Sequence, residues 1–126
     1  MNRSFQTRVG GWVIACFGQD IAENKAERNH RFLEEALELV QCLGCSKVDA
    51  TMLVDYVYDR PEGTPHQEVG GVMITLTALC NASGISLDDA AEDELERVYE
   101  KIDIIRKKQA SKTANSALPS SGIKCA

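Results

Sequence analysis

The sequence predicts an all-α protein, a bundle of four or five helices, from two observations. Apolar residues recur at three- and four-residue steps through most of the chain, which is the period of an amphipathic helix. Ser, Thr and Gly stand between these periodic stretches, where helix caps are expected. The chain has 126 residues and is 44% hydrophobic but only 6% aromatic, which suits one small helical domain with a modest core.

Charge and hydropathy exclude several classes of protein. The net charge of −5 argues against a surface that binds a nucleic acid polymer. No apolar run is long enough to span a bilayer. Arg8 and the pair Gly10-Gly11 interrupt any signal-peptide pattern at the N-terminus. We therefore expect a soluble cytoplasmic protein that binds no membrane.

The first predicted helix covers residues 4–17, and Gly18 is its expected stop. Gly10 and Gly11 weaken this helix by about 1 kcal/mol each relative to Ala. Such glycines would be useful if another backbone or a ligand approached closely. The chain's one Trp, Trp12, follows them. Trp12 either belongs to the core or helps to wall a pocket for a base.

The second predicted helix, from about residue 20 to residue 43, contains the stretch around which the chain is organised, residues 28–41. This stretch has no Pro or Gly and is rich in Glu, Leu and Ala, which are strong helix formers. Its start, from Glu23 to Arg28, is predicted to be an exposed turn of mixed charge. An apolar stripe runs along it, formed by Phe32, Leu33, Ala36, Leu37, Val40 and Leu43.

Three glutamates, Glu34, Glu35 and Glu38, lie beside that stripe. Glu35 and Glu38 are three residues apart, so their carboxylates share a face and repel each other. A cation bound between them would remove that cost, and carboxylate-rich sites suit Mg²⁺, with Mn²⁺ as a substitute. The alternative is a solvated acidic face, which is common on helices.

Two further helices are predicted to follow. Ser46, with Asp49 three residues on, resembles a capping box and opens a third helix, on which Asp55 is one of the acids. Thr64 followed by Pro65 is a strong start for a fourth helix. Residues 69–80 of this fourth helix carry no charge, so we expect it to be the most buried helix.

Glu68, Gly70 and Gly71 stand at the beginning of the fourth helix. Glu68 either favours the helix dipole in the first turn or faces Glu35 and Glu38 as a ligand. Two glycines inside a buried helix cost about 1 kcal/mol each relative to Ala. That cost suggests that a crossing helix or a substrate approaches the backbone there.

The last predicted helix begins at a cap formed by Ser86 with Asp89, after Gly84 has ended the fourth helix. It keeps its apolar steps to about Gln109. Lys101, Arg106 and Lys108 either suit the C-terminal end of a helix or meet an anionic substrate. Residues 110–126 are predicted to be a disordered tail.

Five cysteines without a signal peptide argue against a disulfide framework. Cys16 and Cys80 lie in apolar helical runs and are predicted to be core residues. Cys42 and Cys45 have the CxxC spacing of zinc and redox sites, but two further zinc ligands of similar spacing are not apparent.

The acidic pattern resembles that of the MazG-like all-α nucleoside triphosphate pyrophosphohydrolases, a family with an ExxE pair, a spacer and an ExxD pair. Glu35 and Glu38 match the first pair, and Glu68 opens the second. Gly71 stands where the family usually has Asp, which puts the fourth ligand in doubt. The likeness to the phage-encoded branch, which includes the MazZ-type dATP/dGTP enzymes, rests on residues 27–41, the loop at Arg60-Pro61, residues 68–73 and residues 105–109.

The resemblance implies a catalytic domain over residues 1–109 that hydrolyses a deoxypurine nucleoside triphosphate, dGTP or dATP, to the monophosphate and pyrophosphate. It implies Mg²⁺ as cofactor, a homodimer or homotetramer, and, for a phage protein, the host cytoplasm. Metal-assisted attack of water at the α-phosphorus is the implied reaction. The implied metal ligands are Glu35, Glu38 and Glu68, and Asp55, Glu34 or a water takes the place of the missing Asp. Glu34 is also the candidate base. The candidate substrate contacts are Trp12, Arg31, Gly71, Lys101, Arg106 and Lys108.

A second class of function stays open. The acids could be a solvated face of a non-catalytic helical module that regulates or binds another protein, and Gly71 in place of Asp gives that alternative weight. Metal-dependent release of pyrophosphate separates the two. Base and sugar specificity does not follow from the residues themselves.

Overall fold

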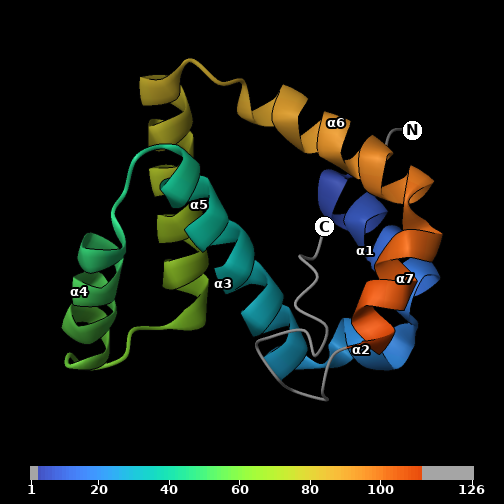
Figure 1. The fold of residues 1–126 in the computed structure, drawn as a ribbon, viewed down its shortest axis with the longest axis horizontal. Coiled ribbons are helices and arrows are strands. Elements are labelled where there is room, and N and C mark those ends of the chain that lie inside the picture. Colours follow the sequence, from blue (N-terminus) through green and yellow to red (C-terminus); the bar gives the residue numbers. More distant parts are fainter. Residues whose placement is uncertain (1–2, 112–126) are drawn as a thin grey trace. The chain divides into compact units, whose positions relative to one another are not determined.

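The computed structural model describes residues 3–111, and helices account for nearly all of them (Figure 1). The helices are α1 (Phe5–Phe17), α2 (Gln19–Glu23), α3 (Lys25–Cys42), α4 (Lys47–Tyr58), α5 (Pro65–Ser83), α6 (Leu87–Glu100) and α7 (Ile102–Ala110). Residues 3–111 contain no strand, so the all-α prediction is confirmed. Within that range no single helix has the length and hydropathy of a membrane span, and α5 with α6 passes that test only as a bent pair. Of the predicted tail, residues 110–126, Ala110 is the last residue of α7, and the part beyond residue 111 lies outside the described residues.

Local capping positions most of the helices as the sequence predicts. Ser46 Oγ accepts a hydrogen bond from the backbone N–H of Asp49 at 3.1 Å. Ser86 Oγ accepts one from Asp89 in the same way at 3.2 Å. Thr64 occupies the cap position before α5, but its side chain makes no capping hydrogen bond. The predicted starts of these helices are therefore confirmed, and the cap chemistry differs at Thr64.

Two of the predicted helices are each broken once, so their predicted continuity was wrong. The first break lies at Asn24, whose Oδ1 accepts a hydrogen bond at 3.2 Å from the backbone N–H of Glu27 and so caps α3. The second lies at Lys101, whose N–H bonds to the carbonyl of Val98 at 3.2 Å, three residues back. The same carbonyl also accepts from the indole Nε1 of Trp12 at 3.1 Å, so a distant side chain joins this turn.

The described chain divides into two compact units. Unit 1 comprises Met1–Glu34 and Glu92–Ala126, with α1, α2 and α7, and α1 packs against both α2 and α7. Its core consists of Cys16, Leu95, Val98 and Ile105, with Val9, Trp12, Phe17 and Ile102 packed against it. The rings of Trp12 and Phe17 meet edge to face, 5.6 Å apart. Cys16 is buried as predicted, and this packing supports the core alternative for Trp12.

Unit 2 is Glu35–Ala91, where the end of α3, then α4, then α5 run in alternating directions (Figure 1). Within residues 35–91, all of which the structure describes, no two helices pack over an extended contact. Cys80 is the one buried side chain of that range, as predicted for it. The prediction that α5 is the most buried helix was wrong, because Val69 is 70% exposed and Ile74 is 72% exposed. The other helices of unit 2 leave much of the apolar surface of α5 exposed.

Candidate functional site

One face of α3 carries a stripe of charged residues, Glu27, Arg31, Glu34 and Glu38, at steps of four, three and four. In unit 1 this charged stripe is the sheltered side of the helix. Glu27 is only 2% exposed, and the side chains of Arg31 and Glu34 are 13% and 24% exposed. Phe32, from the predicted apolar stripe, is 55% exposed. The protected surface of this part of α3 is therefore polar.

Glu27 begins the stripe and is the buried charged residue of the described chain. Its carboxylate accepts a hydrogen bond at 3.3 Å from Nε2 of Gln109 on α7. Beside it, the guanidinium of Arg28 lies 5.2 Å from the ring centroid of Phe17, a cation–π contact. Burying a carboxylate is costly unless it is hydrogen-bonded or paired. The predicted exposed turn was therefore wrong at Glu27, whereas Glu23 and Lys25 are exposed as predicted. No local pattern marks this burial, because Gln109, the hydrogen-bond partner of Glu27, is 82 residues away.

Arg31 and Glu34 form an ion pair one turn further along, with Arg31 Nη1 and Glu34 Oε1 3.3 Å apart. That approach does not have the geometry of a hydrogen bond, and Glu34 Oε1 is buried without accepting one from any residue in 3–111. Nδ1 of the neighbouring His30 is also buried and has no hydrogen-bond partner among residues 3–111. Buried polar atoms of this kind call for a donor, a water or an ion. Glu34 Oε1, in the middle of the stripe, is therefore a hydrogen-bond acceptor for which residues 3–111 provide no donor.

The four predicted metal ligands do not come together in one chain. Glu38 is half-buried, and Glu35, Glu68 and Asp55 are exposed. No three His, Cys, Asp or Glu side chains among residues 3–111 lie close enough to hold a metal ion. The arrangement of residues 3–111 in one chain therefore does not fit the metal centre that the family resemblance implies.

Glu68 instead turns back toward the loop that precedes α5. A Cβ placed on Gly63 would overlap the carboxylate of Glu68, so the two lie in direct contact. A carboxylate in the first turn interacts favourably with the helix dipole, which is the first of the two alternatives given for Glu68. Around Gly70 and Gly71, a Cβ would meet no described atom within 4 Å. Of the two alternatives for these glycines, a crossing helix is therefore not found among residues 3–111.

The predicted phosphate contacts belong to the end of α6 and to α7. Lys101 is exposed at the turn before α7, Arg106 is exposed on it, and Lys108 is half-buried in its last turn. Arg106 lies near the thiol of Cys16. Burial raises the pKa of this thiol, and the positive charges of Arg106 and Arg28 partly offset that rise. The raised pKa keeps Cys16 protonated, which suits packing and not nucleophilic chemistry.

Cys42 and Cys45 are free thiols at the end of α3. Cys42 Sγ donates to the carbonyl of Leu39 at 3.1 Å, and Cys45 Sγ lies 3.7 Å from the carbonyl of Ser46. Each thiol thus turns to a backbone carbonyl, and neither belongs to a group of three ligands among residues 3–111. Cys42 and Cys45 therefore form no zinc site with other residues among 3–111.

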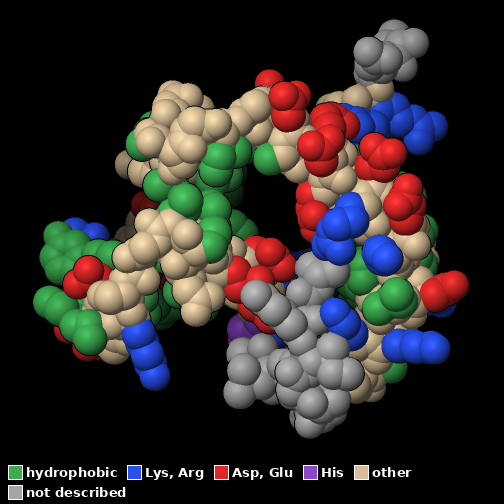
Figure 2. Space-filling view, turned by 45° about the horizontal axis from the view of Figure 1, so that its top comes forward, with side chains coloured by type: hydrophobic (Ala, Val, Ile, Leu, Met, Phe, Trp, Pro, Cys, Tyr) green, Lys and Arg blue, Asp and Glu red, His purple; other side chains and the backbone are tan. Residues whose placement is uncertain are grey.

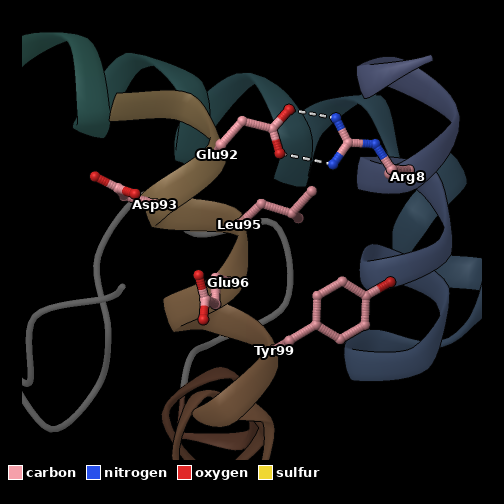
Figure 3. Close-up of a pocket in the computed structure, with 6 residues that line it drawn as sticks. All are labelled: Arg8, Glu92, Asp93, Leu95, Glu96 and Tyr99. Atoms are coloured by element: carbon pink, nitrogen blue, oxygen red, sulfur yellow. Dashed lines mark hydrogen bonds and ion pairs between the residues drawn. The ribbon is translucent and has the colours of Figure 1, made fainter. Parts of the chain in front are cut away.

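A pocket of about 310 Å³ opens in unit 1 between α1 and α6 (Figure 3). Its lining consists of Arg8, Glu92, Asp93, Leu95, Glu96 and Tyr99. Arg8 and Glu92 face each other in a two-pronged ion pair, with Nη1 and Oε2 2.7 Å apart, and this hydrogen bonding lowers the pKa of Glu92. Three carboxylates against one guanidinium repel a polyphosphate. None of the predicted site residues lines this pocket, so it is not the predicted nucleotide site.

Comparison of the chain with family models, with curated proteins and with solved structures finds no match. The family resemblance therefore rests on the quoted residues alone.

Proposed function

We propose that the protein is a nucleoside triphosphate pyrophosphohydrolase of the MazG-like helical type, acting on a deoxypurine triphosphate, dGTP or dATP. The observation that carries the proposal is the sheltered charged stripe of α3, because it combines carboxylates with a guanidinium in the stretch that resembles the family. In the proposed reaction a water oxygen attacks the α-phosphorus, and the bond to the bridging oxygen of the β-phosphate breaks. The products are the monophosphate and pyrophosphate.

Glu34 is the proposed base. Its buried Oε1 accepts no hydrogen bond from residues 3–111, so it is available to take a proton from a water placed beside it. Arg31, 3.3 Å away, is a donor suited to a phosphate oxygen. Lys101, Arg106 and Lys108 remain the proposed further contacts for the phosphates.

Mg²⁺, or Mn²⁺ in its place, is the proposed cofactor, since oxygen-rich sites favour these ions. The proposed ligands are Glu35, Glu38, Glu68 and Asp55. The described residues of one chain do not gather them, so the proposal requires a rearrangement or an assembly that completes the set.

The direct test is a panel of ribo- and deoxyribonucleoside triphosphates incubated with the purified protein and Mg²⁺, with the products separated by chromatography. We expect equal amounts of monophosphate and pyrophosphate from dGTP or dATP, and loss of both products when EDTA is added. Release of orthophosphate and a diphosphate, or no turnover of any nucleotide, would contradict the proposal.

Glu38→Gln is the sharper probe of the site. The amide keeps the size of the side chain but removes its charge, so we expect activity to fall by about 100-fold or more while the helical content stays unchanged. Glu62→Gln, in the exposed loop before α5, is the matched control and should retain full activity. Normal turnover by Glu38→Gln would show that the stripe does not carry the reaction.

A second candidate is a non-catalytic helical interaction module. The exposed apolar residues of α4 and α5 favour it, because a monomeric protein rarely leaves so much apolar surface uncovered. The same nucleotide panel separates the candidates, since an interaction module releases no pyrophosphate.

A further inference from the structure

The pocket of unit 1 is a gap between α1 and α6 that side chains close at both ends (Figure 3). At one end, the two-pronged ion pair joins Arg8 of α1 to Glu92 of α6. At the other end, the ring of Tyr99 extends from α6 toward α1. A Cβ on Gly11 of α1 would lie 3.5 Å from the hydroxyl oxygen of Tyr99, so this hydroxyl lies close to α1. The gap is therefore a bounded site within one unit, with a volume of about 310 Å³.

The lining of this pocket has an excess of negative charge. It contains three carboxylates, those of Glu92, Asp93 and Glu96, and one guanidinium, that of Arg8. The part of α6 in unit 1, residues 92–100, contains five acidic residues and one basic residue, and acidic side chains gather along this helix (Figure 2). A concave surface with an excess of one charge attracts ligands of the opposite charge. The charge of the lining therefore selects a cation.

Glu92 and Glu96 differ in whether a cation of the chain already binds them. The guanidinium of Arg8 donates to Glu92 and also lies 5.5 Å from the ring centroid of Phe5, so two side chains hold it in place. Glu96 lies one helical turn after Glu92 on the same face of α6. It forms no hydrogen bond or ion pair with any residue in 3–111. This face of α6 thus binds one guanidinium and presents a second carboxylate that can bind another.

The apolar part of the lining determines which kind of cation fits. Leu95, which is 8% exposed, points toward α1 between the two ends, and the Tyr99 ring forms one end (Figure 3). The donor set does not suit a metal ion, because no three His, Cys, Asp or Glu side chains among residues 3–111 lie close enough to hold one. An ammonium or guanidinium group needs no such set, since a carboxylate binds it by hydrogen bonds and an aromatic ring by a cation–π contact. Methylene groups beside the charge pack on Leu95 and the ring.

We propose that this pocket binds a small organic cation, a guanidinium or ammonium group on a short apolar stem, with Glu96 as the carboxylate that receives the charge. A free amine and the basic side chain of a peptide share this chemistry. The volume lies at the lower end of the range for ligand pockets, about 300–1,000 Å³, which suits a single group of this size. The proposal is independent of the hydrolase activity, because none of the proposed nucleotide contacts lines the pocket.

The first test is a calorimetric titration of the full-length protein at low ionic strength with two probes. Agmatine represents a free amine, and an acetylated arginine amide represents the side chain of a peptide. We expect saturable binding with a dissociation constant of about 1 mM or tighter, weakened by added salt because charge contributes to it. Binding of either probe supports the proposal, and the probe that binds more tightly identifies the source of the cation. No saturable binding of either probe would overturn the proposal.

The second test compares two glutamates of α6. Glu96→Gln removes the carboxylate that receives the cation and should raise the dissociation constant of the bound probe by about 5-fold or more. Glu100→Gln is the matched control, because Glu100 is exposed on the same helix and the change removes the same charge, but Glu100 does not line the pocket. It should raise the constant by less than about 2-fold, since salt screens a distant charge. An unchanged constant in Glu96→Gln, or equal increases in both variants, would show general attraction to an acidic helix and would overturn the assignment to this pocket.

Discussion

The two units of this protein are both helical, but they differ in how their helices are held together. In unit 1, side chains of α1 reach residues more than eighty places away: Trp12 donates to the carbonyl of Val98, and Cys16 Sγ lies 3.9 Å from the carbonyl of Ile102. On α4 and α5 of unit 2 the side-chain hydrogen bonds are local, such as that of Thr75 Oγ1 to the carbonyl of Gly71 at 2.9 Å. The difference shows that an apolar helix acquires a core only when another element approaches it.

The largest expected effect that tests this comparison comes from Leu95→Ala. Leu95 is 8% exposed in the core of unit 1, so its truncation should cost about 2–5 kcal/mol of the free energy of unfolding, from lost apolar contact and the cavity that remains. The matched change in unit 2 is Met52→Ala, at a residue that is 63% exposed. In dilute, monomeric protein it should change that free energy by less than about 0.5 kcal/mol. Urea titration of both variants measures the contrast, and equal losses would contradict it.

A smaller effect is expected from Glu27, which ties the start of α3 to α7 in unit 1. Glu27→Ala removes the acceptor for Gln109, and we expect a loss of about 1–3 kcal/mol in the free energy of unfolding. Glu27→Gln keeps a side-chain carbonyl in place and should lose less. Urea titration again provides the measurement, with the exposed Glu62→Ala as control. If Glu27→Ala proved as mild as that control, the hydrogen bond to α7 would contribute nothing to unit 1.

The smallest effect is expected from the exposed pair Arg8–Glu92. The hydrogen bonds from Arg8 lower the pKa of Glu92 in the folded state, so the pair's contribution to stability is present above the unfolded pKa, about 4.3 for Glu. It is lost as the pH falls through the folded pKa. The difference in Tm between the unmodified protein and Glu92→Gln should therefore be small at neutral pH and vanish in acid. A difference that grows on acidification would contradict this assignment.

The parts of the fold that depend on neighbours in the sequence were predictable. Ser46 and Ser86 each bond to the residue three positions on, so the sequence contains both partners of the cap. Gly84 ends α5 with a φ of +67°, a conformation that glycine adopts without a steric penalty. The break at Asn24 has the same local signature, because Asn24 Oδ1 accepts a hydrogen bond from the residue three positions on, so this break was predictable but was missed. The break at Lys101 has no side-chain cap. At Lys101 the indole of Trp12 joins the turn, and Trp12 comes from the other end of the chain.

The candidate site was predictable only as a pattern along one helix. The spacing of Glu34, Glu35 and Glu38 identifies acids beside one another, but it does not say which side of the helix is sheltered. The burial of Glu27 depends on Gln109, which is 82 residues away, and the apolar residues of α5 are not covered by the other helices of residues 35–91. The absence of charge in residues 69–80 predicts that another surface covers this helix, but the sequence does not identify that surface.

The position of Trp12 gives the two units separate optical signals. It is the one Trp of the chain, and its ring packs in unit 1, so its fluorescence reports the environment of that unit alone. Circular dichroism at 222 nm reports helices from both units. If unit 2 loses its structure first on dilution or heating, the two signals will follow different transitions, and a two-state description will fail. The indole in the core of unit 1 thus serves as a built-in reporter of whether this protein melts as one cooperative body or as two.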